Sequence, residues 1–466
     1  DVYKRQVLEE HLETTVKAHN QLLHRRVDLL LRTGKLLVES LADTNRIVRN
    51  MKRTAAYLGI PEEKLHINVS FTMLMVNVSD GDYSFTKFQR IEGHGVNMTA
   101  ISEVSKLSWR AIEENYTLEQ YEEELEKIRT KKRNYTPWQV AVGAGFACGG
   151  FCIQFGCDWM AFLYASIAAI IGMRVRFRCN ESGLNHYMGI AIAAFVSTLL
   201  AWASTLLPAD WTSTPWHPLL ACALFIVPGV PLINFVDDML DNYIQVGIVR
   251  AVNTLLMVSA MAFGIAFAVK LCRIDDFFPT ISMVPHHAYW EYALAAAISA
   301  MGFSMIFNIQ RRLLWVVAIG GILAVCTRNF VNLGPSTDNI GLDMGLVIGS
   351  FSGSVLVSLI AVKAVHWFHV PNHVLTIPSV IPMIPGVLMY RMLFGLINMN
   401  VTDIDKVTSL MKAIECGVNS GLVIMCIALG VAIPNIFGRK YISSAKNKRL
   451  DAMLKKRREK GQFVEW

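Results

Sequence analysis

The stretch "FIVPGVPLINFVDD", residues 225–238, starts as an apolar run that could belong to a membrane helix. It then carries two prolines, a glycine, an asparagine and two aspartates, which a spanning helix disfavours. Proline removes a backbone N–H and glycine permits unusual dihedral angles, so the stretch predicts an interrupted helix. A second stretch, "IPMIPGVLMYR" (residues 381–391), repeats the Pro-Gly pair in similar apolar surroundings. The chain is therefore predicted to contain two helices that are interrupted in the same way.

The composition favours a membrane protein over a soluble one. Of the 466 residues, 53% are hydrophobic and only 17% are charged, whereas soluble domains usually carry about 25% charged residues. The net charge of +7 is most concentrated in the tail at residues 438–460, and a basic tail usually marks the cytoplasmic side of a membrane. The nine cysteines match no zinc or disulfide pattern, so we expect neither a metal nor a cofactor.

The first six residues, "DVYKRQ", resemble the translation of a sequencing-library transposon end. We hypothesise that residues 1–6 are an assembly artefact and leave them out of fold reasoning. Finding these codons in the genome would contradict the hypothesis.

Residues 7–137 are predicted to form a small cytosolic α+β domain. Apolar residues at helical spacing within residues 42–58 predict a helix that ends at Gly59 and Pro61. The domain carries no G-x-S-x-G, H-E-x-x-H or P-loop pattern, which argues against an enzyme.

The rest of this domain is predicted to combine a hairpin with a second helix. Alternating apolar and polar residues over 65–73 predict one strand. A turn at residues 79–82 would return the chain to a partner strand at residues 83–88. Thr117 is expected to be the N-cap of a charged helix.

From residue 138 onward the chain is apolar, with short polar interruptions. Ten runs of roughly 17 to 25 residues are long enough to cross the hydrocarbon core of a bilayer. The predicted spans are residues 138–155, 159–175, 187–207, 217–240, 249–271, 287–309, 313–330, 340–365, 374–399 and 415–437. Basic residues precede the first span and follow the second, sixth and tenth, which places both termini in the cytoplasm. We expect a multi-pass membrane protein.

The membrane region is predicted to consist of two repeats, residues 138–272 and 273–438, followed by a basic cytosolic tail at residues 439–466. A shift of 152 residues aligns three spans of the two halves without a gap. Small residues match in this alignment: Gly189, Ala193, Ser197 and Ala201 fall on Gly341, Gly345, Gly349 and Gly353. Small residues at every fourth position let another helix approach closely, so we expect these glycines to pack helices. Because each half has five helices, the second enters the membrane from the opposite side, which predicts a 5+5 inverted repeat.

The two interruptions correspond between the halves, with Pro228-Gly229 matching Pro385-Gly386 at a slightly larger offset. Such a break leaves backbone N–H and C=O groups without partners, which is costly in lipid. We therefore expect the interruptions to meet in one buried, hydrated pocket, where the N-terminal ends of the half-helices bind a carboxylate. The alternative is a pair of ordinary proline kinks.

Polar side chains follow the first interruption and its second proline, Pro231. Asn234, Asp237 and Asp238 are costly at membrane depth and therefore candidates for function. Asn234 and Asp238 share a helix face. Asn234 would donate to a substrate carboxylate, while Asp238 would hold a proton or bind an amine.

Tyr390 and Arg391 follow the second interruption. Arg391 could pair with Asp237 or Asp238, bind an anionic substrate, or extend to the membrane interface as many arginines do. Asp343, at the start of the glycine-rich span, is a second candidate proton carrier.

These segments resemble the threonine/serine exporter (ThrE) family. The resemblance rests on "ADTNRIVRNMKRTAAYLGIPEE", "INVSFTMLMV" and "PGVPLINFVDDML", and the last five spans resemble the second membrane domain of that family. The positions that match the motif are Pro228, Gly229, Pro231, Asn234, Asp238, Gly247 and Arg250. Asp241 stands where a glycine is expected, so the motif does not fix the end of that helix.

The resemblance implies export of threonine and serine from the bacterial cytoplasm, driven by the proton motive force. Related two-protein systems, which carry the same two domains on separate chains, are similar to a succinate exporter, so export of a dicarboxylate is the alternative. A membrane-anchored enzyme that uses the N-terminal domain is the alternative from another class. The expected partners are a small-molecule substrate and membrane lipid but no nucleic acid, and a homo-oligomer is left open.

Overall fold

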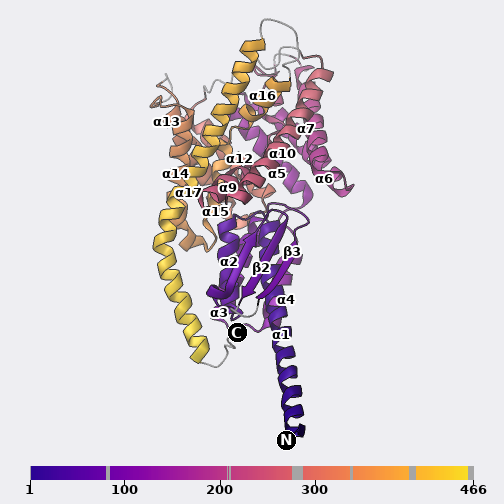
Figure 1. Ribbon diagram of the computed structural model, residues 1–466. Coiled ribbons are helices and arrows are strands. Elements are labelled where there is room, and N and C mark those ends of the chain that lie inside the picture. Colours follow the sequence, from indigo (N-terminus) through magenta and orange to yellow (C-terminus); the bar gives the residue numbers. More distant parts are fainter. Residues whose placement is uncertain are drawn as a thin grey trace. The chain divides into compact units, whose positions relative to one another are not determined.

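The computed structural model describes residues 2–79, 84–206, 208, 211–274, 287–335, 340–397 and 406–459 (Figure 1). The chain divides into two compact units. The N-terminal unit comprises Asp1–Lys132 together with Ile442–Trp466, and the helical unit comprises Arg133–Tyr441. Most of the predicted turn at residues 79–82, and the end of the span predicted at residues 374–399, lie outside the described residues.

The N-terminal unit is an α+β fold. Its helices are α1 (Val2–Glu39), α2 (Thr44–Tyr57), α3 (Met98–Glu113) and α4 (Leu118–Thr130). Its strands are β1 (Leu65–Val69), β2 (Met73–Ser79) and β3 (Ser84–Arg90), which pair antiparallel in the order β1-β2-β3. Helices α1 and α2 contact the sheet, and α3 and α4 pack on these two helices. The helix predicted within residues 42–58 is confirmed as α2, and Thr117 caps α4 as expected.

The single strand predicted over residues 65–73 is wrong, because the chain turns within it. Ser70 N–H donates to Met73 O at 2.8 Å, which closes a tight turn between β1 and β2. Met73 is therefore exposed, and Leu74, Val76 and Val78 are the residues of β2 that enter the core. The alternation of polar and apolar residues continues across the turn and therefore conceals it.

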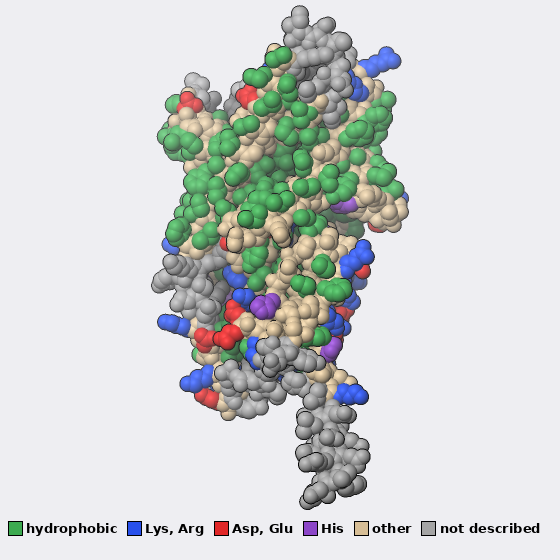
Figure 2. Space-filling view, in the orientation of Figure 1, with side chains coloured by type: hydrophobic (Ala, Val, Ile, Leu, Met, Phe, Trp, Pro, Cys, Tyr) green, Lys and Arg blue, Asp and Glu red, His purple; other side chains and the backbone are tan. Residues whose placement is uncertain are grey.

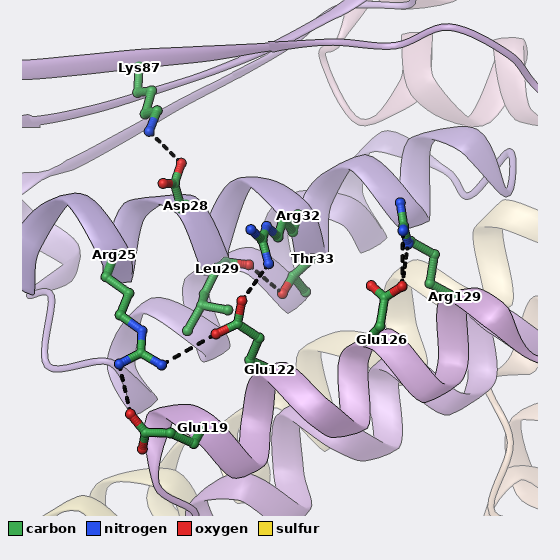
Figure 3. A network of polar contacts seen from close by, with 10 residues as sticks. All are labelled: Arg25, Asp28, Leu29, Arg32, Thr33, Lys87, Glu119, Glu122, Glu126 and Arg129. Atoms are coloured by element: carbon green, nitrogen blue, oxygen red, sulfur yellow. Dashed lines mark hydrogen bonds and ion pairs between the residues drawn. The ribbon is translucent and has the colours of Figure 1, made fainter.

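Ion pairs and one buried tyrosine hold the helices of this unit together. Arg25 contacts Glu119 at 2.7 Å and Arg32 contacts Glu122 at 2.6 Å, joining α1 to α4 (Figure 3). These pairs are solvent-exposed, and such pairs contribute little to stability. The Tyr121 hydroxyl, by contrast, is buried and lies 3.0 Å from the hydroxyl of Thr33 on α1. Burial raises the pKa of Tyr121, so this hydroxyl stays protonated and available as a donor.

From Ile442 to Glu459 the basic tail is helical and forms part of the N-terminal unit. It is the last section of α17 (Lys406–Glu459). Within the unit, Arg449 forms an ion pair with Glu113 of α3, and the guanidinium of Arg457 lies 5.0 Å from the ring centroid of Tyr57 on α2. The tail is therefore packed against this unit instead of extending freely from the last span.

The helical unit places a helix, or a bent pair of helices, at each of the ten predicted spans. In chain order these are α5 (Pro137–Gln154), α6 (Trp159–Glu181), α7 (His186–Ala203), α8 (Pro218–Ala221) with α9 (Gly229–Leu240), α10 (Ile244–Leu271), α12 (Tyr289–Ile306), α13 (Leu314–Asn332), α14 (Leu346–Phe368), α15 (Asn372–Val380) with α16 (Gly386–Ile397), and α17. Among the described residues, six helices are long and apolar enough to cross a membrane, or eight if each bent pair is one span. The predicted spans outside that count are α5 and α12. Figure 2 shows hydrophobic side chains covering the visible face of this unit.

Helices α5 and α12 pack directly against each other through glycines. A Cβ on Gly150 would lie 2.6 Å from Ala295 O, and a Cβ on Gly302 would lie 2.4 Å from Gly143 O. A shift of 152 residues converts the first contact into the second. Phe151 and Phe303, which the same shift relates, meet edge to face with their ring centroids 5.8 Å apart. The two helices therefore contact each other through equivalent positions.

The ends of α5 and α12 are also joined reciprocally. Before α5, the Asn134 N–H donates to Asn308 Oδ1 at 2.8 Å, in the turn that follows α12. Before α12, the His287 ring lies with Nε2 2.8 Å from Cys157 O, in the turn that follows α5. Gly156 and Asn308, again 152 residues apart, both have positive φ in these turns. Each helix thus begins where the other one ends.

Only two of the four glycines predicted to line one helix face lie in a helix. Gly349 and Gly353 lie in α14, where added Cβ atoms would come within 2.6 Å of carbonyl oxygens of α13. Gly341 and Gly345 precede α14, so their placement in that helix is corrected. Asp343 N–H donates to Leu333 O, and Gly345 adopts a φ of +86°, so α14 begins only at the next residue. The segment instead satisfies carbonyls at the C-terminal end of α13.

We predict that Gly302→Ala destabilises the protein by about 1–3 kcal/mol, because the added methyl group meets the backbone of α5. Gly421→Ala is the matched control, since Gly421 is an exposed helical glycine and a Cβ added there would have no atom within 4 Å. Thermal unfolding of the purified protein in detergent, followed by tryptophan fluorescence, compares the two variants. Equal unfolding temperatures would contradict the packing described for α5 and α12.

Candidate functional site

The two interrupted spans share one backbone design. The segment before α9 meets α9 at an angle of 59°, and the segment before α16 meets α16 at 57°. At the first break Val227 N–H donates to Leu224 O and Gly229 N–H to Val227 O. At the second break Ile384 N–H donates to Ile381 O and Gly386 N–H to Ile384 O. A shift of 157 residues relates both pairs of hydrogen bonds.

The first turn of each half-helix tolerates the prolines. Pro228 and Pro385 stand immediately before α9 and α16, where a backbone N–H would have no partner within the helix. Pro231 lies in the first turn of α9, where the missing N–H is also not required. The prolines therefore set where each half-helix begins, and they do not disrupt its interior.

The two interruptions are in contact with each other, as the sequence predicts. A Cβ on Gly229 would lie 2.3 Å from Ile381 Cδ1, and a Cβ on Gly386 would lie 2.8 Å from Leu224 Cδ2. Each glycine thus lies against a residue of the short helical segment that leads to the opposite break. The structure therefore places the two breaks side by side.

A small cavity lies where the interruptions meet, but its lining differs from the expected hydrated pocket. It is lined by apolar side chains and one glycine: Phe151, Leu224, Val227, Phe303, Ile381, Ile384 and Gly386. These residues offer no side-chain hydrogen bond to a carboxylate or to water. The side chains at the breaks themselves thus form an apolar contact, where the sequence predicts a hydrated pocket.

The polar cluster lies further along α9 and is fully buried. Asn234, Asp237 and Asp238 are each no more than 2% exposed. Asp238 Oδ2 lies 3.2 Å from Arg250 Nε on α10, and Arg250 is equally buried. The sequence points to Arg250 only through the motif, with no role assigned to it. The structure joins it to Asp238 in an internal ion pair.

The turn between α9 and α10 makes this pair possible. Asn242 has a φ of +68° and reverses the chain after α9 ends, with Asp241 at the C-cap. A Cβ on Gly247 would lie 2.9 Å from Phe235 O, so only glycine lets α10 approach α9 this closely. Gly247 stands three residues before Arg250, and the close approach brings the guanidinium back beside Asp238.

Asp237 contacts a residue that no sequence pattern identifies. His373 Nε2 on α15 lies 3.8 Å from Asp237 Oδ2, and both side chains are buried. Asn435 Nδ2 on α17 lies 3.1 Å from the same ring nitrogen, and Asn372 donates to Asn435. His373 precedes the residue at which the ninth span is predicted to begin, so the hydropathy pattern places it in a loop. This contact links α9 of the first half to two helices of the second.

The second interruption contributes Tyr390, which is buried and donates to Leu220 O on α8 at 2.9 Å. Its neighbour Arg391 is half-buried on α16. The cation that lies beside Asp238 is Arg250, a pairing that the sequence did not predict. Asp343 is exposed in the connection between α13 and α14. The structure therefore brings Asp238 together with Arg250, and Tyr390 together with α8, while Asp343 lies outside the helices.

Comparison with known proteins gives matches over most of the chain. Residues 28–272 match the ThrE family model, described as "Putative threonine/serine exporter". Residues 292–437 match the ThrE_2 model, described as "Threonine/Serine exporter, ThrE". No solved structure matches the chain.

Two bacterial relatives are similar to about half of the chain. A protein of Klebsiella aerogenes named "Probable succinate transporter subunit YjjP" is 25% identical over 243 residues, which are 52% of this chain and 92% of the relative. The protein of the same name from Escherichia coli K12 is also 25% identical over 243 residues, with 93% of its length covered. Both names describe transport.

We predict that Gly229→Ala and Ile381→Val compensate for each other. The added methyl group at Gly229 meets Ile381 Cδ1, and that carbon is the atom that valine lacks. The double variant is expected to be more stable than the sum of the single effects by about 0.5–3 kcal/mol. Gly229→Ala combined with Ile360→Val is the control, because Ile360 is exposed on α14. Additive unfolding free energies in both pairs would contradict the contact between the interruptions.

Proposed function

Because the chain belongs to the threonine/serine exporter family, we propose that it exports threonine and serine across the bacterial inner membrane in exchange for protons. The family and the names of the relatives describe transport, so we do not propose an enzyme that uses the N-terminal unit. The family supports a multi-pass membrane transporter. We propose its substrate, its coupling ion and its topology.

The buried pair of Asp238 and Arg250 carries this proposal. Charged groups at membrane depth are costly and are kept mainly for function. An amino-acid zwitterion has one carboxylate and one ammonium group, which complement one arginine and one aspartate. Asn234, one helical turn before Asp238, would add a hydrogen-bond donor for the carboxylate or the hydroxyl group. This set of side chains matches a small hydroxy amino acid without leaving a net charge in the membrane.

Asp238 is our first candidate for the proton carrier. A carboxylate that exchanges a cationic partner for a proton couples proton movement to substrate movement, because the two states bind substrate differently. Asp343 is the second candidate. Its exposed position outside the helices gives it less differential contact with substrate than Asp238 has.

We further propose that residues 138–272 and 273–438 form a 5+5 inverted repeat with both termini cytoplasmic. The reciprocal contacts of α5 with α12, and of one interruption with the other, support this arrangement. A twofold relation exchanges the contacts of one half for those of the other, as shifts of 152 and 157 residues do here. In this proposal α5 and α12 also cross the membrane, and the rocking of the halves gives alternating access.

The interruptions then border the solute pathway without binding the carboxylate at their own breaks. Pro228, Gly229, Pro385 and Gly386 would shape an apolar constriction, and Tyr390 would attach one half to the other. The substrate site would lie beyond the constriction, at Asn234, Asp237 and Asp238.

Export of a dicarboxylate such as succinate is the second candidate. It is favoured by the names of the two relatives, which describe succinate transporter subunits. A dianion needs a second cation besides Arg250, and His373 or Arg391 would have to supply it.

We predict protonophore-sensitive efflux of labelled threonine and serine from preloaded bacteria that express this chain, and none above background from cells without it. Asp238→Asn is expected to abolish the coupled efflux, because the side chain can no longer exchange a proton. Asp241→Asn is the control, being a carboxylate at the end of the same helix, and expression is matched by immunoblot. Asp343→Asn in the same assay tests the second proton candidate. Efflux of succinate alone would select the dicarboxylate, and wild-type efflux from Asp238→Asn would remove Asp238 from the coupling mechanism.

A further inference from the structure

We infer that Arg250 is the receptor for the carboxylate of the transported solute, and that Asp238 occupies it as an internal substitute until the solute arrives. The inference rests on the proposed function as a carrier of small carboxylates. It assigns separate roles to the two members of one ion pair: Arg250 is required for every carboxylate substrate, and Asp238 decides which class is preferred.

The geometry of the pair fits an exchangeable contact. Asp238 Oδ2 lies 3.2 Å from Arg250 Nε, which is longer than the roughly 2.7–2.9 Å of a strong charge-assisted hydrogen bond. A free carboxylate that reaches the guanidinium could instead bind through two parallel hydrogen bonds. The protein's own carboxylate is fixed to α9 and is held at a less favourable distance. A solute carboxylate can therefore displace it.

The burial of the pair argues against a purely stabilising role. Arg250 and Asp238 are 2% and 1% exposed. Removing two charges from water is costly, and apolar residues of similar volume often stabilise such a site as well or better. A buried pair of charges at two positions of the motif is therefore better explained by ligand exchange than by folding.

The surrounding backbone supports a movable aspartate beside a fixed arginine. Asp238 lies on α9, a short half-helix that is bent by 59° from the segment before it. Arg250 lies on α10, which continues without a break from Ile244 to Leu271. Gly247 provides the close contact between these helices, so a small shift of α9 changes the distance between the charges. Movement of the half-helix would uncover Arg250.

The two substrate classes then respond oppositely to Asp238. An amino acid places its carboxylate on Arg250 and its ammonium group on the displaced Asp238, so it benefits from the aspartate. Of the two members of the pair, a dicarboxylate gains only from Arg250 and is repelled by an ionised Asp238. Removing the charge at position 238 therefore weakens binding of the amino acid and strengthens binding of the dicarboxylate, whichever is the natural substrate.

The test is equilibrium binding of labelled threonine and labelled succinate to the purified full-length chain in lipid nanodiscs. Asp238→Asn is expected to shift the ratio of the two Kd values at least tenfold toward succinate, about 1.4 kcal/mol. Arg250→Gln is expected to raise the Kd of every ligand that the wild type binds by at least about tenfold. Arg250→Lys is expected to lose less affinity than Arg250→Gln, because lysine keeps the positive charge although it lacks the planar guanidinium group. Asp241→Asn is the matched control and leaves the ratio unchanged.

The possible results separate this inference from the proposed function. An unchanged Kd ratio in Asp238→Asn, or wild-type binding by Arg250→Gln, overturns the inference while leaving transport of a carboxylate intact. Equal losses of both ligands in both variants also overturn it, because that pattern marks a structural pair. A wild-type chain that binds neither ligand overturns the proposed function together with the inference. Arg250→Lys and Asp238→Glu replace any variant that does not elute as a folded monodisperse protein.

Discussion

The helical unit depends on how it satisfies two interrupted helices. In hydrocarbon, the backbone groups freed by a break have no water to bind, so a break is tolerated only where protein covers it. Here each break is covered by the other: Gly229 packs on Ile381, and Gly386 packs on Leu224. The equivalent hydrogen bonds at the two breaks reduce the number of backbone N–H and C=O groups that need another partner. The reciprocal contact explains why the interruptions occur as a matched pair.

This constraint also separates the roles of the apolar and polar residues. The place where the breaks meet is apolar, and its lining residues come from the crossing helices α5 and α12 as well as from the breaks. The ionisable groups lie further along α9, where Gly247 brings α10 close enough for Arg250 to reach Asp238. An apolar constriction beside a charged binding site is a useful combination for a carrier. In the proposed mechanism, the constriction would block water and ions, while the charged site would recognise the solute.

The contacts of His373 connect the two halves of the helical unit. His373 and Asn435 belong to helices of the second half. His373 lies beside Asp237 of the first half, and Asn435 lies beside His373. Tyr390 makes a comparable connection in the other direction, from α16 to the carbonyl of Leu220. A movement of one half relative to the other therefore changes the surroundings of the buried aspartates. The proposed binding site therefore lies at the interface between the halves.

Local chemistry makes the interruptions predictable, whereas contacts that depend on turn geometry are not. Pro228-Gly229 and Pro385-Gly386 identify the breaks because proline and glycine have direct consequences for the backbone. The pairing of Asp238 with Arg250 depends on the left-handed conformation of Asn242, and an asparagine in a polar stretch does not by itself predict that conformation. Gly345 fits a helical pattern that the structure does not follow, because small residues at every fourth position also occur in loops. The hairpin at Ser70 is hidden because a two-residue turn preserves the alternation of the strands on either side.

The central claim is that one chain, which matches both family models, is sufficient to carry a small carboxylate solute across a membrane. The most direct test is counterflow in liposomes that contain only this purified protein and are loaded with unlabelled threonine or succinate. We expect external labelled solute of the carried class to accumulate transiently inside, and a proton gradient to change the extent of accumulation. Folded protein that gives no counterflow of either solute would contradict the claim.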